Sequence, residues 1–315
     1  MDALDVRILC AVAFPRTGWP DTAEGRATVA HRLRVDEKTV RSRLRRLESE
    51  GFIKYYQATP NFDLLGMPVE LTDRMEAMNI VTKLRALRDA LGRPGTIEAY
   101  DFLGPTFQLT VAGATREAAA GTLRSVAERY ELARVPMAEH RTPAPGYLPS
   151  LLDWRIVAQM RYDARVDASE LARQLGITGR IVRYRLRRLT RSGAIIVRPV
   201  IDPQRQQGLV FYRLTVTVEP GSQAAVLGRL QELFAESIWD HQMMAEGPLR
   251  LDLFSFTLGG PEAAVETALG IDGVRSCSAL TLKEIREPPR PSWIDRWIAD
   301  IGRGSPSEPG SSGLR

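Results

Sequence analysis

An arginine-rich stretch occurs twice in this chain, once as Val40-Arg41-Ser42-Arg43-Leu44-Arg45-Arg46-Leu47 and again as Val182-Arg183-Tyr184-Arg185-Leu186-Arg187-Arg188-Leu189. The two copies differ at a single position, Ser42 against Tyr184, and a glycine follows each of them, Gly51 or Gly193. A self-match of this kind indicates that the chain contains two copies of one smaller fold. The fold around this stretch therefore decides the fold of both halves.

The repeat continues over nearly all of each half. Leu4-Asp5-Val6-Arg7-Ile8 matches Leu152-Asp153-Trp154-Arg155-Ile156 at an offset of 148 positions, whereas Val40 and Val182 are 142 positions apart. The difference indicates an insertion in the first copy, at 15–20, where turn-forming residues allow a longer loop at little cost. Gly104-Pro105 and Gly247-Pro248 extend the match further. Between the copies, the prolines of 142–150 predict an extended linker.

Composition places the chain among multidomain globular proteins of mild charge. Its 315 residues can form several domains, and 43 Lys and Arg face 38 Asp and Glu, a net charge of +5. A nucleic-acid-binding role therefore depends on where the charge lies. Cys10 and Cys277 stand in different halves and are predicted to be reduced thiols, which suits the cytoplasm. The sequence has neither an apolar run of spanning length nor a signal-peptide pattern, which argues against membrane and secreted proteins.

Each half begins with three helical patterns and a strand-like run. The predicted helices lie at 4–13, at 27–33 and between Asp36 and Gly51 in the first copy, and at 152–162, at 168–175 and between Thr178 and Gly193 in the second. Asp36 and Thr178 are suited to cap the third helices, and the two glycines to end them. Runs at 52–58 and 194–201 predict a strand hairpin after each third helix. This order predicts two winged helix-turn-helix domains, in which the third helix enters the major groove of DNA.

Helical periodicity predicts which face of the third helix would meet DNA. An apolar stripe would pack on the first two helices: Val40, Leu44 and Leu47 in one copy, Val182, Leu186 and Leu189 in the other. The outward face would present Lys38, Ser42 and Arg45, or Arg180, Tyr184 and Arg187, to the bases. The flanks, where phosphates would run, carry Arg41, Arg46, Arg183 and Arg188. A single charge run would indicate only a solvated basic helix, but its recurrence in the same context favours DNA binding.

The two third helices differ in charge. From Asp36 to Gly51, five basic residues face four acidic ones, which leaves +1. From Thr178 to Gly193 there are six arginines and no acidic residue, which leaves +6 in a chain whose net charge is +5. The positive field is therefore expected at the second copy.

The second part of each half has the pattern strand-helix-strand-strand-helix-strand. In the first copy these elements are predicted at 69–78, 81–91, 96–103, 106–112, 115–130 and 133–140, and in the second at 210–218, 223–234, 237–245, 249–258, 262–269 and 274–285. This order is that of a ferredoxin-like domain, a four-stranded antiparallel sheet with both helices on one face. The predicted fold is thus α+β, a tandem repeat of winged helix-turn-helix and ferredoxin-like domains. The domain boundaries are expected at 1–66, 67–141, a linker at 142–150, 151–208, 209–288 and a tail at 289–315.

These motifs resemble the Lrp/AsnC family of transcriptional regulators. The resemblance rests on Leu-Asp-x-x-Ile at the start of each half and Val-Arg-x-Arg-Leu-Arg-Arg-Leu before the glycine, and the chain looks like two such subunits fused. It implies pairing through the ferredoxin-like sensor sheets, further homo-oligomer assembly, and amino acids or related metabolites as effectors. The recognition-helix role would pass to Lys38, Ser42, Arg45, Arg180, Tyr184 and Arg187.

The chain departs from that family at the predicted effector site. The family commonly has an aspartate three residues beyond the glycine of the central strand turn, where this chain has Phe107 and Arg250. A different small molecule, or no effector at all, is therefore as much to be expected as an amino acid. An effector would bind near Gly104 and Gly247; in the alternative interpretation, which we favour, both glycines only permit a tight hairpin turn.

The resemblance also raises an enzymatic alternative, because some siroheme decarboxylases look like paired Lrp/AsnC-type subunits. The chain has three histidines, His31, His140 and His241, spread over different predicted domains, and no metal-ligand cluster, nucleophile motif or phosphate loop. We therefore predict no catalytic residue, no metal, no cofactor and no enzymatic activity, and keep a tetrapyrrole decarboxylase as the alternative.

A third alternative is an adaptor whose winged domains bind protein. A predicted helix at 292–301 carries an apolar stripe that could support it, although such a helix more often packs on its own chain. Residues 302–315 are rich in Gly, Ser and Pro and are predicted to be disordered. The sequence favours a cytoplasmic, sequence-specific transcription regulator that binds double-stranded DNA.

Overall fold

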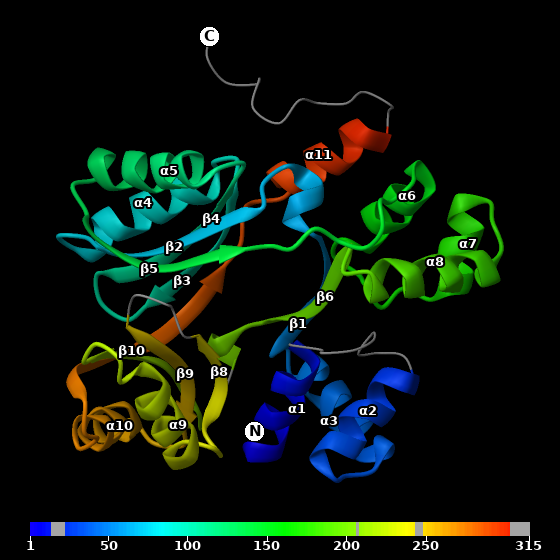
Figure 1. Ribbon diagram of the computed structural model, residues 1–315. Coiled ribbons are helices and arrows are strands. Elements are labelled where there is room, and N and C mark those ends of the chain that lie inside the picture. Colours follow the sequence, from blue (N-terminus) through cyan, green and yellow to red (C-terminus); the bar gives the residue numbers. More distant parts are fainter. Residues whose placement is uncertain (14–22, 206–207, 243–247, 303–315) are drawn as a thin grey trace.

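One series of elements occurs twice along the chain (Figure 1). The computed structural model describes residues 1–13, 23–205, 208–242 and 248–302. Each half contains three helices and a strand, followed by strand-helix-strand-strand-helix-strand, and a last helix closes the described part. The fold is α+β and a tandem repeat of winged helix-turn-helix and ferredoxin-like domains, as the sequence predicts.

The winged domains have the predicted helices. They are α1 (Ala3–Ala13), α2 (Ala23–Leu33) and α3 (Glu37–Ser49) in the first copy, and α6 (Leu151–Met160), α7 (Ala168–Leu175) and α8 (Gly179–Arg191) in the second. Asp36 caps α3 by accepting the Thr39 amide at 2.7 Å, and Thr178 caps α8. Gly51 and Gly193 adopt φ of +73° and +72° just after these helices, a conformation that glycine tolerates best. The insertion predicted at 15–20 lies outside the described residues.

The prediction of a hairpin after each third helix was wrong. Each copy provides one strand there, β1 (Ile53–Pro60) or β6 (Ile195–Ile201), followed by a short 3-10 turn. The two strands pair with each other in antiparallel register, for example Pro60 opposite Ile195. A lone strand leaves its backbone groups without partners, and here the other copy satisfies them. The two winged domains are thereby joined, and they lie on the same side of the molecule (Figure 1).

The ferredoxin-like domains share one continuous sheet. The first comprises β2 (Val69–Glu76), α4 (Ile80–Leu91), β3 (Thr96–Phe102), β4 (Thr106–Gly113), α5 (Arg116–Arg129) and β5 (Ala133–Arg141). The second comprises β7 (Val210–Val218), α9 (Gln223–Leu233), β8 (Ile238–Gln242), β9 (Leu249–Ser255), α10 (Gly260–Leu269) and β10 (Val274–Arg286). The strand order is β5-β2-β4-β3-β10-β7-β9-β8. The long strand β10 pairs with β7 in its first part and with β3 from Leu282 to Arg286, which joins the two four-stranded units.

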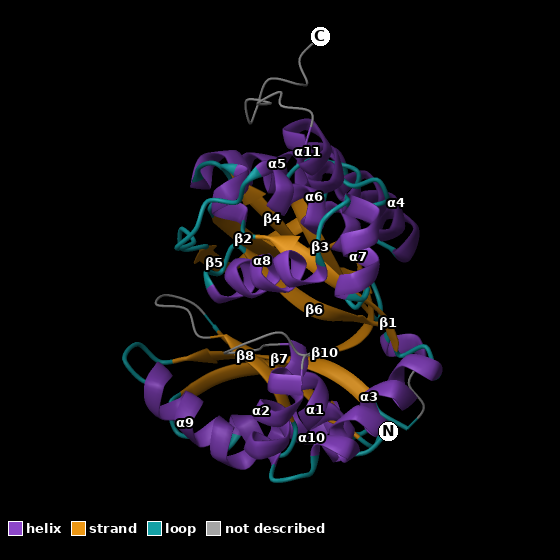
Figure 2. Ribbon diagram, turned by 90° about the vertical axis from the view of Figure 1, so that its right-hand side faces the viewer, coloured by secondary structure: helices purple, strands orange, loops and turns teal. Residues whose placement is uncertain are grey.

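The two ferredoxin-like domains also pack face to face. Helices α4 and α5 cover one outer face and α9 and α10 the other, with the strands between them (Figure 2). Arg213 on β7, 2% exposed, donates to Asp252 at 2.5 and 2.8 Å, reaches Gln108 on β4 and lies 4.2 Å over the Tyr100 ring of β3. Because this side chain connects strands of both copies, the packing of the two ferredoxin-like domains is internal to the chain.

The linker is held by hydrogen bonds at both ends. Its Gly146 amide donates to the Ser192 carbonyl at 3.0 Å, and the Asn61 amide group donates to the Pro143 carbonyl at 3.0 Å. Thr142 donates its backbone N–H to the Pro68 carbonyl at 2.8 Å. The position of the second winged domain relative to the first is therefore fixed by the linker as well as by the β1–β6 pair.

The last helix, α11 (Trp293–Gly302), packs on its own chain. Ile294 and Ile298 are buried, and Trp297 meets Trp154 of α6 edge to face at 5.2 Å between ring centroids. Trp293 stacks on Phe62 and donates its indole N–H to the Thr96 carbonyl at 2.7 Å. The apolar stripe that could have supported an adaptor role is thus used internally, and the tail at 303–315 lies outside the described residues.

Among the described helices, none combines the length and the apolar character needed to cross a bilayer. Cys277 on β10 is half-buried and unpaired, and burial raises the pKa of its thiol to about 11. At neutral pH this thiol is protonated and therefore poorly reactive.

Candidate nucleic-acid interface

The orientation of α8 follows from its two faces. Val182 and Leu189 are buried and Leu186 is half-buried against the winged-domain core. Helix α7 ends at Gly176 in the left-handed conformation, and α8 begins just after it at the Thr178 cap. This is the tight turn of a helix-turn-helix, and it directs the arginine face of α8 away from the core.

All five second-copy residues predicted from the sequence are exposed on α8. Exposed side chains there are Arg180, Arg183, Tyr184, Arg187 and Arg188, to which the structure adds Arg191. Tyr184 is 60% exposed, so its ring and hydroxyl are accessible at the surface. Helix α8 itself contains no acidic residue.

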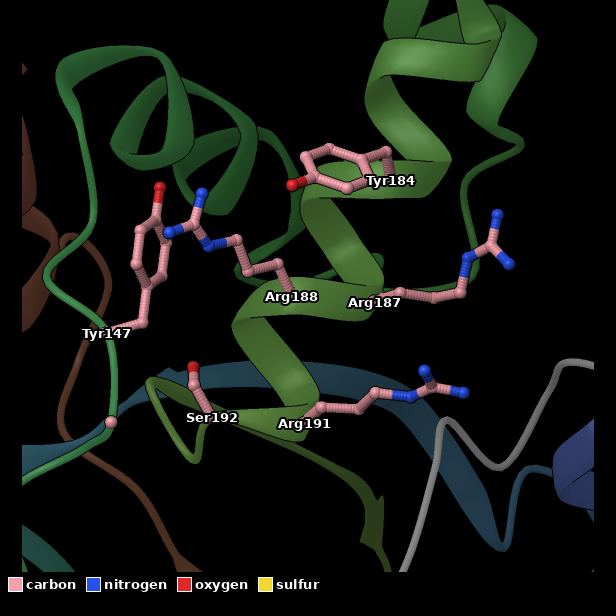
Figure 3. Close-up of a pocket in the computed structure, with 7 residues that line it drawn as sticks. Tyr147, Tyr184, Arg187, Arg188, Arg191 and Ser192 are labelled. Carbon is pink, nitrogen blue, oxygen red and sulfur yellow. The ribbon is translucent and has the colours of Figure 1, made fainter.

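An open hollow of about 490 Å³ lies beside α8 (Figure 3). It is lined by Gly146, Tyr147, Tyr184, Arg187, Arg188, Arg191 and Ser192. Arg188 extends toward the Tyr147 ring, whereas Arg187 and Arg191 extend from the other side of the helix (Figure 3). The sequence did not predict Tyr147, Arg191 and Ser192 as part of this site. For Tyr147, the available signal was the presence of an aromatic residue in a proline-rich linker.

The matching face of α3 is exposed too. Lys38, Arg41, Ser42, Arg45 and Arg46 are all accessible at the surface. Arg46, however, forms an ion pair with the buried carboxylate of Asp5 on α1, and Arg43 donates to the same carboxylate at 3.0 Å. Two of the five basic residues of α3 are therefore directed at α1.

Acidic side chains further reduce the positive electrostatic potential around α3. Asp36 and Glu37 at its start and Glu50 at its end are exposed. The Thr39 backbone N–H, which donates to Asp36, holds the pKa of this carboxyl below its usual range, so the group is charged at neutral pH. Helix α3 therefore carries both signs of charge, whereas the charged side chains of α8 itself are all basic, with the exposed Asp167 at the start of α7 near enough to interact with Arg183.

The second copy contains the same buried carboxylate with different partners. Asp153 on α6 is fully buried and accepts from Arg185 at 3.0 Å, as Asp5 does from Arg43. The Tyr147 hydroxyl donates to Asp153 Oδ2 at 2.6 Å, and the Arg188 guanidinium instead lies 3.9 Å over the Tyr147 ring. Burial opposes ionisation of Asp153, but bonds from Tyr147, Ser150 and Arg185 outweigh it and lower its pKa.

The predicted effector positions fall in the ferredoxin-like domains. Gly104 adopts a φ of +79° in the turn between β3 and β4, and its carbonyl accepts a hydrogen bond from Lys83. Phe107 and Arg250 are buried on β4 and β9. Gly247 lies outside the described residues.

The histidines are dispersed. His31 and His140 are exposed on α2 and β5, and His241 belongs to β8. Within the described ranges, no three His, Cys, Asp or Glu side chains are grouped closely enough to hold a metal ion.

Comparison with known proteins supports the winged domain and the fold. Residues 150–196 match a family described as winged helix-turn-helix DNA-binding, a range that covers α6, α7 and α8. No curated protein matches the sequence. The crystal structure of the siroheme decarboxylase NirDL is similar at a TM-score of 0.53 and 14% identity, covering 96% of this chain and 99% of that one. AsnC from E. coli is similar at a TM-score of 0.36 and 18% identity, covering 43% of this chain and 92% of that one.

One sequence-based prediction is corrected by these comparisons. The absence of a recognisable catalytic motif led to the expectation that the chain is not an enzyme. A fold that matches over almost its full length belongs to an enzyme, the siroheme decarboxylase, so that expectation was wrong. The lack of a local sequence motif does not exclude an enzyme, because one fold can carry different functions.

Proposed function

We propose that this protein is a cytoplasmic, sequence-specific transcription regulator built from two fused Lrp/AsnC-like units, with the domain boundaries inferred from the sequence. The observation that carries the proposal is the outward face of α8, where Arg180, Tyr184 and Arg187 are exposed and flanked by Arg183 and Arg188. Each arginine that contacts a phosphate releases condensed counterions, and an arginine can also donate two bonds to a guanine edge.

The joined architecture supports simultaneous use of both recognition helices. The β1–β6 pair, the continuous sheet and the anchored linker connect the two winged domains at several places. Two helices held in this way would contact half-sites at a fixed spacing, about 34–36 Å or a multiple of it on one face of DNA. Hydroxyl-radical footprinting should therefore give two protected regions in a constant phase; variable spacing among bound sites would argue against the paired arrangement.

The operator should be asymmetric. The base-facing positions are Lys38, Ser42 and Arg45 on α3, but Arg180, Tyr184 and Arg187 on α8. Different side chains select different base edges, so the two half-sites should differ in sequence. Selection of binding sites from random duplex DNA, together with genome-wide mapping of bound sites, tests the proposal. A perfectly palindromic motif would contradict the assignment of the reading residues, and no enrichment of any motif would refute the function.

A regulator of this kind would be modulated through its ferredoxin-like domains. The Lrp/AsnC resemblance suggests that a small molecule and further self-association act there. Thermal-shift screening with amino acids and related metabolites tests the first expectation, and sedimentation velocity tests the second.

A tetrapyrrole decarboxylase is the second candidate function. It is favoured by one observation, the similarity to the siroheme decarboxylase over 96% of this chain, which is a similarity of fold. That enzyme also has a structure in complex with an iron-uroporphyrin III analogue. Titration of the purified protein with siroheme, followed by absorbance and by mass analysis of the product, tests it. A decarboxylated product would establish catalysis, and the absence of any spectral change would exclude it.

A further inference from the structure

We infer that Tyr147, in the linker, is a positioning residue that keeps the Arg188 guanidinium available for a DNA phosphate. The inference rests on the proposed DNA-binding function and deepens it, because it identifies why one copy of the recognition helix has an additional free cation. It follows from a difference between two otherwise matching sites, the one around Asp5 and the one around Asp153.

In the first copy, both nearby arginines are bound to the buried carboxylate. Arg43 donates to Asp5 Oδ1 at 3.0 Å, and Arg46 pairs with Oδ2. Arg46 also lies 3.8 Å from Glu50, one helical turn further along. Its charge is therefore largely compensated within the protein before any DNA arrives.

In the second copy, the equivalent carboxylate oxygen is already occupied. Oδ2 of Asp153 accepts the Tyr147 hydroxyl at 2.6 Å, the Ser150 hydroxyl at 2.7 Å and the Ser150 backbone N–H at 2.8 Å. Three donors saturate a carboxylate oxygen, so Arg188 has no acceptor there. Among the described residues, Arg188 forms no ion pair with a carboxylate.

The contact that Arg188 does make leaves its donors free. Its guanidinium carbon lies 3.9 Å from the centroid of the Tyr147 ring (Figure 3). A stacked guanidinium is held by its face, and its N–H groups point outward from its edge, where they can bind a phosphate. The ring thus restricts the arginine without neutralising it, which reduces the side-chain entropy lost when DNA binds.

Tyr147 is itself fixed in place. Its ring packs against the winged-domain core, and the neighbouring Gly146 amide is bonded to the Ser192 carbonyl at 3.0 Å. The linker therefore has a second role besides connection, because it carries the residue that distinguishes the electrostatics of α8 from those of α3.

The test compares the salt dependence of operator binding in the full-length protein and four variants: Tyr147→Ala, Tyr147→Phe, Arg188→Ala and the double variant of Tyr147→Ala with Arg188→Ala. Leu148→Ala, at an exposed neighbour in the same linker, is the matched control. Tyr147→Ala should lower the slope of log affinity against log salt by about 0.9, as Arg188→Ala does, which between 50 and 200 mM salt is a change of about 3.5-fold. The double variant should match the single ones, because both remove the same phosphate contact.

Tyr147→Phe should retain the wild-type slope, since it keeps the ring and two donors on Asp153 Oδ2. Thermal unfolding confirms that each variant is folded. The inference is overturned if the wild type binds DNA but Tyr147→Ala keeps its slope, if Tyr147→Phe loses it, or if the Tyr147 and Arg188 effects add. If the wild type shows no salt-dependent DNA binding, the proposed function fails, and this inference with it.

Discussion

Removal of matched arginines from the two recognition helices should affect DNA binding unequally. Arg41 and Arg183 occupy the same position of the repeat, 142 residues apart, and both are exposed. Arg183 belongs to a helix without acidic residues, in which Arg185 is paired to the Asp153 carboxylate of α6; Asp167 at the start of α7 interacts with Arg183 itself. Arg41 belongs to a helix in which Arg43 and Arg46 are paired and Asp36, Glu37 and Glu50 are exposed.

The expected magnitude follows from counterion release. If Arg183 neutralises one phosphate, Arg183→Ala lowers the slope of log affinity against log salt by about 0.9, and the loss of affinity between 50 and 200 mM salt becomes about 3.5-fold smaller. Arg41→Ala should change the slope less, because the acidic residues of α3 already weaken its attraction for phosphate. Both substitutions should weaken binding to specific and unspecific DNA alike, since phosphate contacts carry no sequence information.

Fluorescence anisotropy with operator and scrambled duplexes, at four or more salt concentrations, measures these slopes. Arg187→Ala serves as the contrasting variant: at a base-facing position it should cost about 1–3 kcal/mol on the operator and little on scrambled DNA. Equal slope changes for Arg41→Ala and Arg183→Ala would refute the reasoning, because the charge asymmetry would then be a property of the solvated surface alone.

Three further predictions concern the joined core. Arg213→Met leaves the buried Asp252 carboxylate unpaired and should lower the free energy of unfolding by about 3–5 kcal/mol, measured by urea denaturation; a stability change below about 1 kcal/mol would contradict the role of this side chain between the sheets. Trp293→Ala removes the stack on Phe62 and the bond to the Thr96 carbonyl, and should cost about 3–5 kcal/mol in the same assay; an unchanged midpoint would mean that α11 is dispensable for stability. Burial opposes ionisation of Asp295, but hydrogen bonds from Tyr162 and Arg161 outweigh it and lower the pKa of this carboxyl. The contribution of Asp295 to the free energy of unfolding is therefore present above about pH 4 and is lost as the pH falls through the folded-state pKa. Asp295→Asn should reduce the loss of stability below about pH 4, and an identical pH profile of stability would contradict this.

Local features of the fold could be predicted from the sequence because they depend on neighbouring residues. Asp36 and Thr178 cap their helices, and Gly51 and Gly193 take left-handed conformations after them. The apolar stripe of α3 is buried as its spacing requires. Each of these properties is decided within one or two helical turns of the chain.

Pairing between the copies could not be predicted in the same way. The runs that form β1 and β6 each indicate a strand, but nothing in their residues distinguishes a hairpin within one copy from a pair between two copies. The extension of β10 onto β3 depends equally on where the other domain lies. Strand partners far apart in sequence are selected by the packing of whole domains, so a local pattern shows that a strand exists but not what it pairs with.

The site around α8 depends both on the local sequence of the helix and on the packing of a segment distant from it. Its exposed arginines follow from helical spacing, but the position of Tyr147 depends on how the linker folds back onto the end of α8. A symmetric homodimer has the same residues around both of its recognition helices, whereas two copies within one chain can diverge. Here the buried Asp5 carboxylate pairs with two arginines, whereas the equivalent Asp153 carboxylate pairs with one arginine and accepts from a tyrosine. Under the proposed function, two differing copies within one chain would let one winged domain provide most of the electrostatic attraction for DNA, while the other would add a second reading surface at a fixed distance.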